Sequence, residues 1–297
     1  MAGARRARVA YLGPAGTFSE DALLAAAGEE AEAVPKPTIF DAIQAVAGGE
    51  VDRALVPFEN SIEGAVRATL DALAFDVEGV AIVGEHDHPV RHALIARPGT
   101  RVEEVEVVLS HPQANAQCAR FVRERLPQAT VRAAASTAEA VRSVSLSKDP
   151  WAALGAPAAA RLYSCEVLAE GVEDAADNVT RFVWLAREAA VEGAGASAGA
   201  AAGDDAPWRT TLVFSELGAD HPGALVEALT EFSSRDVNLT RIESRPLRRG
   251  LGRYMFFVDL EGRAGDSTVA EAVEGLRTKA ESVRILGSYP VLPAGVP

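Results

Sequence analysis

The sequence predicts an α/β protein in which two lobes are followed by a smaller C-terminal domain. Short apolar, β-rich runs alternate with helical patterns as far as residue 187, which is typical of sheets flanked by helices. Residues 192–206 consist almost entirely of Ala, Gly and Ser without periodicity, which indicates a flexible linker and a domain boundary. Six further elements follow in the order βαββαβ, the order of a ferredoxin-like fold of about 80 residues.

The composition bounds the size and the partners of the protein. Its 297 residues are enough for about two domains, and 48% of them are hydrophobic, so a sizeable core can be buried. The formal net charge of -13 argues against a nucleic-acid or anionic-membrane partner, because both bind clustered Lys and Arg. An anionic small molecule would need a local positive site built from a few Arg residues, backbone N–H groups and helix N-termini.

The two cysteines and the N-terminus predict a cytoplasmic protein. Cys118 and Cys165 are too few for a disulfide framework in a chain of this length, so a reducing compartment is expected. The apolar run at residues 9–12, after a basic start, is too short for a signal peptide. No apolar stretch reaches the length of about 18 residues that a membrane span needs.

The first lobe opens with a strand at residues 8–12 and a Gly-rich turn at residues 13–20. Thr17 and Glu20 fit a capping box for the helix at residues 21–27. Such a turn offers free N–H groups to an anion, although a simple tight turn between strand and helix explains it as well. It matches neither the Walker A nor the dinucleotide-binding pattern.

Polar residues recur where strands end. Thr38 caps a second helix, and Asn60 and Ser61 follow a short buried strand at residues 53–57, just before a helix at residues 65–73. In α/β folds ligands bind at the carboxyl ends of strands, so Asn60 is a candidate binding residue. A plain pair of helix-capping residues is the structural alternative.

Residues 80–95 are predicted to be extended and contain a run of histidines. His86 and His88 would share one face of a strand, which makes a metal site conceivable. No further ligand stands at a suitable spacing, so we predict that the protein holds no metal.

A strand at residues 105–109 ends at Ser110, and a helix then continues to residue 126. Ser110 is predicted to cap this helix, on which Gln113 and Gln117 lie one turn apart. Ser110 and Gln117 are therefore candidates to hydrogen-bond a ligand, with a capped and solvated helix as the alternative. The remaining elements of the lobe are a strand at 131–133, a helix at 136–144, a strand at 151–155 and a helix at 156–163.

The stretch at residues 177–185 leads from an acidic turn into an apolar strand and carries Thr180, Arg181 and Phe182 side by side. On a strand, Thr180 and Phe182 point to one face and Arg181 to the other. The preceding turn relaxes this alternation, so the three side chains remain candidates to converge on one anionic ligand that carries a ring.

The order of elements indicates that the chain crosses between two lobes and back. We expect one lobe from residues 7–80 with 166–187 and the other from residues 81–165, with the polar strand ends along one cleft. A linker at 188–208 precedes the C-terminal domain at 209–288. That domain has predicted strands at 210–215, 237–243, 254–260 and 283–286, and helices at 224–232 and 267–280. It contains no obvious nucleophile and base, so a regulatory or binding module is expected.

Four segments together resemble the signatures of the prephenate dehydratase family, in the family's order: residues 13–19, 56–61, 110–113 and 178–182. The C-terminal part resembles an ACT domain, in which residues 223–225 and 243–246 are similar to the two phenylalanine-binding motifs. The resemblance implies a two-lobed fold like that of periplasmic binding proteins. It also implies cofactor-free conversion of prephenate to phenylpyruvate, water and carbon dioxide in phenylalanine biosynthesis, inhibition by L-phenylalanine at the ACT domain, and a homodimer or homotetramer.

The resemblance also implies roles for single residues. The threonine that is essential in the family corresponds to Thr180, and we expect it to assist departure of the ring hydroxyl. The substrate-binding candidates are Thr17 through nearby N–H groups, Asn60, Ser110, Gln117, Arg181 as a carboxylate clamp and Phe182 as pocket wall or core. For the effector, the helix N-terminus at Gly223, Ala224 and Leu225 suits a carboxylate. Asn238, Glu243 and Ser244 would meet its ammonium group.

Three other functions remain open from the sequence. Arogenate dehydratase performs the same elimination on the amino-acid form of the substrate and has the same motifs. A non-enzymatic solute-binding protein would also have two α/β lobes, but the missing export signal and Thr180 argue against it. An amino-acid sensor would require an inactive dehydratase part, whereas all four signatures are intact.

Overall fold

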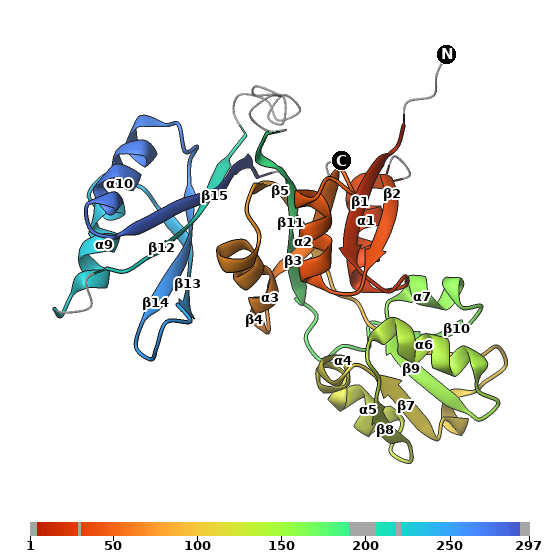
Figure 1. Cartoon of the computed structure of the whole chain (residues 1–297). Helices are drawn as coiled ribbons and strands as arrows, with labels where there is room; N and C mark the ends of the chain where they lie inside the picture. Colours follow the sequence, from red (N-terminus) through yellow and green to blue (C-terminus); the bar gives the residue numbers. More distant parts are fainter. Residues whose placement is uncertain (1–4, 29–30, 190–205, 218–220, 292–297) are drawn as a thin grey trace.

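The computed structural model describes residues 5–28, 31–189, 206–217 and 221–291. It confirms two α/β lobes followed by a βαββαβ domain, and Figure 1 shows the three parts with the first lobe in the middle. Most of the predicted linker, residues 190–205, lies outside the described residues. None of the described helices combines the length and the apolar content that crossing a bilayer requires.

The first lobe is built on a sheet in which β1 lies between the parallel strands β2 and β3. β11 runs antiparallel between β3 and β5. The strands of this lobe are β1 (Ala7–Leu12), β2 (Ala31–Lys36), β3 (Arg53–Asn60), the short β4 (Gly64–Ala65), β5 (Val80–Pro89) and β11 (Val179–Arg187). Its helices are α1 (Phe18–Ala27), α2 (Ile39–Ala47), α3 (Arg67–Asp71) and a π-helical turn, Ala72–Asp76.

Alternation along β1 explains how the helices cover this sheet. Val9 and Tyr11 point to the face on which α1 packs with Leu23, whereas Ala10 points to the opposite face, where α2 packs with Ile43. Both faces are therefore buried, which suits the apolar runs of the strands.

The second lobe has its own five-stranded sheet in the order β10-β6-β9-β7-β8. Its strands are β6 (Ala93–Ala96), β7 (Val107–Ser110), β8 (Thr130–Ala133), β9 (Trp151–Gly155) and β10 (Glu166–Glu170). Its helices are α4 (Pro112–Gln117), α5 (Ala119–Arg125), α6 (Thr137–Leu146) and α7 (Pro157–Leu162), with a short 3₁₀ turn at Val102–Glu104.

The chain crosses between the lobes at other places than the sequence predicted. Residues 80–95 are not one extended segment: β5 belongs to the first sheet and β6 to the second, so the crossing falls at residues 90–92. On the way back, β10 still pairs with β6, and the return crossing is residues 171–178. The predicted lobe boundaries at 80 and 166 differ from these crossings, because β pairing between distant segments, rather than local pattern, assigns a strand to its sheet.

The helix caps match the prediction only in part. The Thr38 hydroxyl accepts the N–H of Asp41, as expected for the cap of α2. The capping box at Thr17 is wrong, because the Thr17 hydroxyl donates to the carbonyl of Leu12 instead. The Glu20 carboxylate accepts the N–H of Gly16 and the Tyr11 hydroxyl, so it ties the turn to β1.

The C-terminal domain is a sheet with two buried faces. Its elements are β12 (Trp208–Ser215), α9 (Ala224–Ser233), β13 (Leu239–Pro246), β14 (Tyr254–Glu261), α10 (Ser267–Arg277) and β15 (Ser282–Pro290). On one face, Leu212 and Val258 pack with both helices. On the other face, Val213 and Phe257 join the core of the first lobe, which includes Leu70 of α3.

This domain is also joined to the first lobe through a strand contact. β15 pairs in parallel with β5 at a single position, Gly287 opposite Ile82, so one sheet path runs through both. A Cβ atom on Gly287 would lie 2.1 Å from the carbonyl oxygen of Ile82. The residue at this point must therefore be glycine for the two backbones to approach so closely.

Candidate active site

A group of buried and half-buried polar side chains joins the two lobes where the chain crosses between them. Thr180 on β11 lies directly opposite Asn60 at the end of β3, in the first lobe. Gln117 ends α4 in the second lobe. His92 and Asn178 lie on the two crossing segments between them. We call these five residues the inter-lobe network.

Two backbone groups determine the direction of the hydrogen bonds in this network. The side-chain oxygen of Asn60 accepts the N–H groups of Ile62 and Glu63, both at 3.0 Å. Because these N–H groups can only donate, the other end of the amide must be the donor. The Asn60 amide therefore donates to Asn178 Oδ1 at 2.8 Å and to the Thr180 hydroxyl oxygen at 2.9 Å.

The same logic continues into the second lobe. Since Asn178 accepts through Oδ1, its Nδ2 donates to Gln117 Oε1 at 3.1 Å. His92 Nε2 lies 3.1 Å from the same oxygen, so it must carry the hydrogen. The side-chain N–H groups of Gln117 therefore point away from Asn178 and His92. The Gln117 Nε2 atom lies 3.4 Å from Glu63 Oε1. Each amide in the network therefore has one defined orientation.

This geometry leaves the Thr180 hydroxyl as a donor. Its oxygen accepts from Asn60, and within the described residues its hydrogen has no acceptor. The hydroxyl is largely buried, with Thr180 9% exposed and Asn178 1% exposed. A hydroxyl held in this way is oriented to give a hydrogen bond to a group placed beside it.

The turn before α1 reaches the network from the other side. The ring of Phe18 stands edge-on to the ring of His92, with centroids 4.9 Å apart. Gly16 lies against α7 of the second lobe, where a Cβ atom would come within 3.2–3.3 Å of Leu162, Ala159 and Tyr163. Thr17 itself makes no bond to the network, so only the neighbouring backbone N–H groups remain candidates for substrate contact.

Arg181 does not lie in this site. Its guanidinium points to the opposite face of β11, where it contacts Asp259 of the C-terminal domain at 2.6 Å and Glu59 at 3.0 Å. The structure therefore does not bring Arg181 to the place where it was predicted to clamp a substrate carboxylate. The reason is strand alternation, which the preceding turn does not relax because Thr180 and Arg181 both lie within β11.

Phe182 and Ser110 are also placed away from the network. Phe182 is 2% exposed and packs in the core between β1, β3 and α1, with Leu23 among its neighbours. Ser110 is fully buried, and its hydroxyl donates to the carbonyl of Leu154. Its predicted role as a helix cap is wrong, because His111 caps α4 by accepting the N–H of Gln113.

The sequence prediction missed His92 and Asn178 as site residues. Asn178 stood within the stretch that contains Thr180, and its short amide was the available signal. The histidine run suggested only a possible metal site. In the structure, His88 Nε2 lies 3.2 Å from Asp21 Oδ2, and His92 Nε2 hydrogen-bonds to Gln117. No cluster of three metal-ligating side chains occurs among the residues that the structure describes.

Comparison with known proteins identifies the family. The family model "Prephenate dehydratase" matches residues 9–190, more than half of the chain. The chain belongs to the prephenate dehydratase family. A second model, "ACT domain", matches residues 212–278, so the C-terminal domain is an ACT domain.

Individual relatives extend this result. The prephenate dehydratase of Amycolatopsis methanolica is 41% identical over 95% of this chain and 88% of its own. The prephenate dehydratase of Arthrobacter aurescens, solved in complex with L-Phe, matches with a TM-score of 0.83 and 40% identity over 97% of this chain and 93% of its own. GqqA, described as a quorum quenching acylase, matches with a TM-score of 0.82 and 30% identity over 96% and 98% of the two chains.

The residues predicted to bind the effector do not all lie close together within one chain. Gly223 caps α9 in a left-handed conformation with φ of 100°, beyond the end of β12 at Ser215. Ser215 and Arg245 both pair with Met255, so the motif at Glu243 and Ser244 approaches the same end of the sheet. Asn238 precedes β13 at the opposite end, where its carbonyl accepts the N–H of Glu261.

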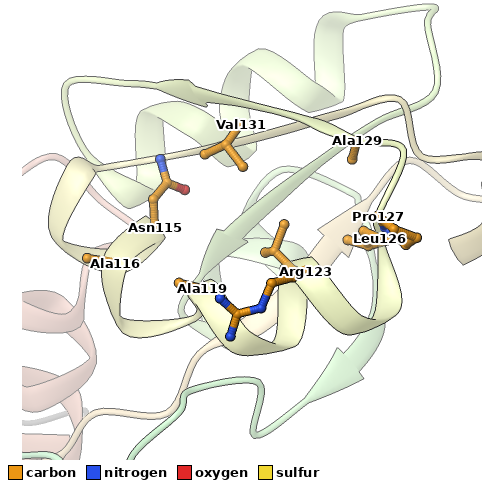
Figure 2. A pocket seen from close by; sticks show the side chains of 9 residues that line it. Asn115, Ala116, Ala119, Arg123, Leu126, Pro127, Ala129 and Val131 are labelled. Atoms are coloured by element: carbon orange, nitrogen blue, oxygen red, sulfur yellow. The ribbon is translucent and has the colours of Figure 1, made fainter.

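Two cavities of the protein lie away from the inter-lobe network. Figure 2 shows the first, about 520 Å³ in volume, between α4, α5 and β8, with Val131, Leu126 and Asn115 in its lining. The second, about 410 Å³, lies between the ACT domain and the first lobe and includes Phe75 and Phe214. Neither is lined by a predicted site residue, so hydrogen-bond geometry, and not cavity size, identifies the candidate active site.

Proposed function

We propose that this chain is a prephenate dehydratase, a carbon–oxygen lyase that forms phenylpyruvate, water and carbon dioxide and is inhibited by L-phenylalanine at its ACT domain. The observation that carries the catalytic part is the Thr180 hydroxyl, whose oxygen accepts from Asn60 and whose hydrogen has no acceptor in the described part of the chain. The relatives support the substrate, and the L-Phe complex of the Arthrobacter enzyme supports the effector.

The reaction needs little more than orientation and help for a leaving group. Prephenate carries a carboxylate on a quaternary ring carbon and a hydroxyl on the ring carbon across from it. The ring carboxylate leaves as carbon dioxide, its bonding electrons enter the ring, and the bond to the hydroxyl breaks. That oxygen takes up a proton and leaves as water, while the ring becomes aromatic. The driving force therefore lies in the substrate, and no cofactor or metal is required.

Thr180 is proposed to donate a hydrogen bond to the departing hydroxyl. Because the Asn60 amide donates to the threonine oxygen, the hydrogen of Thr180 is directed away from Asn60. A threonine hydroxyl is a weak acid, so much of its effect is electrostatic stabilisation of the charge that develops on the leaving oxygen. Donation to a leaving group is typically worth about 10²–10⁴-fold in rate.

Two groups are proposed to hold the substrate carboxylates. The Gln117 N–H groups face a carboxylate in this structure, that of Glu63, which a substrate carboxylate would replace. The N-terminus of α1 supplies the positive end of a helix dipole and the N–H groups of Phe18 and Ser19, which have no acceptor among the described residues. Neither depends on Arg181, whose charge is used at the ACT domain.

Acyl transfer, suggested by the likeness to the acylase GqqA, is the less favoured activity. A nucleophilic threonine must give its proton to a base. Here the Thr180 oxygen instead accepts from the Asn60 amide, and no described base takes its hydrogen. This direction of the hydrogen bond favours donation by the Thr180 hydroxyl over its attack on a carbonyl.

The deciding experiment follows phenylpyruvate formation from prephenate by the purified full chain without added cofactor, with and without L-phenylalanine. Turnover suppressed by L-phenylalanine is expected. Turnover without suppression would retain the enzyme and remove the effector. With arogenate as the second substrate, faster phenylalanine formation would assign the chain as an arogenate dehydratase. Folded protein that turns over neither substrate would favour a binding protein or sensor.

The assembly and location belong to the same proposal. β13 forms an edge of the sheet, and its residues alternate between half-buried and exposed, with Ile242 46% exposed. An unpaired edge of this kind suits pairing with a second copy of the chain, which would bring two sets of effector motifs together in a homodimer or homotetramer. Both cysteines are free thiols, which fits a cytoplasmic location.

Acidic pH is expected to lower the free energy of unfolding because of His92. Burial lowers the pKa of His92, against the raising effects of its bond to Gln117 and of the nearby Glu173. The unfolded ring takes up a proton near its ordinary value of 6.5, whereas the native ring does so only at lower pH. Stability from the neutral ring is therefore complete above pH 6.5 and is lost as pH falls through the lower native pKa.

Unfolding and kcat/KM measured from about pH 8 to about pH 5 would check this. His92→Gln keeps a donor for Gln117 and removes the titration, so its decline in stability should begin at lower pH than that of the parent protein. His86→Gln is the matched control for kcat/KM: burial also lowers the pKa of His86, so the substitution should shift the stability profile, but the ring lies outside the network and the pH profile of kcat/KM should stay that of the parent protein. Equal pH profiles for His92→Gln and the parent protein would contradict the prediction.

A further inference from the structure

The strand pair that carries Thr180 presents a different polar pair to each side. On β11 and β3, Thr180 lies opposite Asn60 and the next residue, Arg181, lies opposite Glu59. Successive side chains point to opposite faces of a sheet, so the first pair faces the inter-lobe network and the second faces the ACT domain. The active site and the regulatory domain therefore share one backbone segment.

Arg181 is bound to the ACT domain by a buried ion pair. Its Nη2 atom lies 2.6 Å from Asp259 Oδ2 on β14, and Asp259 is fully buried. The other oxygen of Asp259 accepts the hydroxyl of Thr211 on β12 at 2.8 Å, which fixes the carboxylate within the ACT sheet. Burial pulls the pKa of Arg181 down, but Asp259 and Glu85 outweigh this effect and raise it, so the guanidinium stays charged.

Further charges from both domains surround this pair. Glu85 on β5 contacts Arg181 at 3.4 Å and Arg209 of the ACT domain at 2.5 Å. Glu59 contacts Arg241 of the ACT domain at 3.4 Å. The guanidinium groups of Arg181 and Arg241 both lie over the ring of Phe58, at 5.0 and 4.9 Å. Three arginines and three carboxylates thus join the two domains at this point.

Buried charges make this junction resistant to sliding. If the ACT sheet moved relative to β11, either Arg181 would follow or a buried charge would lose its partner, and an unpaired buried charge is strongly unfavourable. Because Arg181 and Thr180 are consecutive, any displacement that follows the ACT domain is passed to Thr180 through one peptide unit. The long linker at 188–208 is not needed for this connection.

We propose that Arg181 is a positioning residue through which the ACT domain holds Thr180 in place, and that effector binding reaches the active site through the Arg181–Asp259 pair. This inference rests on the proposed dehydratase function and its inhibition by L-phenylalanine. A ligand on the ACT domain shifts the catalytic strand only if it binds one arrangement of the two domains more tightly than the other. Because the ion pair is a rigid contact, the position of Thr180 differs between the two arrangements.

The test uses the full chain and two Asp→Asn variants of matched chemistry. Asp259→Asn removes the charge that faces Arg181 and keeps an oxygen for Thr211. Asp71→Asn is the control, because Asp71 on α3 also pairs across the same interface, with Arg245 at 2.8 Å, but has no ion pair or hydrogen bond with β11 among the described residues. Prephenate kinetics, inhibition by L-phenylalanine and calorimetric binding of L-phenylalanine are measured for each, together with thermal unfolding.

For Asp259→Asn we expect about a tenfold lower kcat with KM within about twofold, and a concentration for half-inhibition raised at least about tenfold while L-phenylalanine still binds. Asp71→Asn should keep kcat and inhibition near the parent values. If Asp259→Asn does not fold, Thr211→Val removes the hydroxyl that bonds Asp259 and Tyr289 but keeps the charges of Arg181 and Asp259, so it should weaken inhibition to a smaller extent.

Several outcomes would overturn the inference. The first is parent-like inhibition of folded Asp259→Asn, and the second is parent-like inhibition of Thr211→Val where Asp259→Asn does not fold. The third is an equal loss of inhibition in Asp71→Asn that still binds L-phenylalanine, which would indicate general loosening of the interface. Failure of the proposed function is recognised separately, in the parent protein. Lack of prephenate turnover would refute the proposed enzyme, and turnover that L-phenylalanine does not suppress would refute the proposed effector; either result would refute this inference as well.

Discussion

Thr180→Ala is expected to lower kcat for prephenate by about 10²–10⁴-fold, with a small change in KM. The side chain is proposed to act on the leaving hydroxyl, a bond that breaks only in the transition state, so its loss should appear in kcat. Initial rates of phenylpyruvate formation over a range of prephenate concentrations separate the two constants.

Two further substitutions at this position separate chemistry from packing. Thr180→Ser keeps the hydroxyl and the bond from Asn60, so it should retain most of the activity. Thr180→Val keeps the shape but removes the hydroxyl, so it should be as inactive as Thr180→Ala. Near-normal turnover by folded Thr180→Val would show that the hydroxyl has no role in departure of the leaving group.

Asn60→Asp is expected to lower kcat by about 10²–10³-fold, the usual cost of losing one oriented donor in a catalytic site. An aspartate in this position can still accept the N–H groups of Ile62 and Glu63. It cannot donate to Thr180, and its second oxygen would instead accept the Thr180 hydrogen. The substitution therefore reverses the orientation of the hydroxyl while it changes the volume very little.

The control for Asn60→Asp is Ser61→Ala. Ser61 is the next residue and also ties β3 to the return crossing, since its hydroxyl donates to the carbonyl of Asp177 and accepts the N–H of Val179. It makes no contact with Thr180 among the described residues. Activity that falls equally in both variants would point to general disorder of this corner, and the proposed direction of the hydrogen bonds would then be wrong.

Local pattern in the sequence was enough for most of the elements and for the family, although the prediction did not contain the strands β2 and β10. Strand alternation favoured opposite faces for Thr180 and Arg181, and the capping role of Thr38 was correctly predicted. These features depend on neighbours within one or two turns of chain, so periodicity and residue type encode them. The motifs likewise carried the family resemblance that the comparisons confirmed.

The tertiary structure alone decided which polar groups meet. Asn60 and Thr180 are 120 residues apart, and Arg181 and Asp259 are 78 apart. Because β5 pairs within the first sheet and β10 within the second, the chain crosses between the lobes at residues 90–92 and 171–178. These crossings place His92 and Asn178 in the network. Strand alternation in the sequence favoured an Arg181 side chain that faces away from Thr180, but it did not exclude convergence of the two. Only the packing of the ACT sheet against β11 gave that buried charge a partner, because burial and pairing depend on contacts between distant segments.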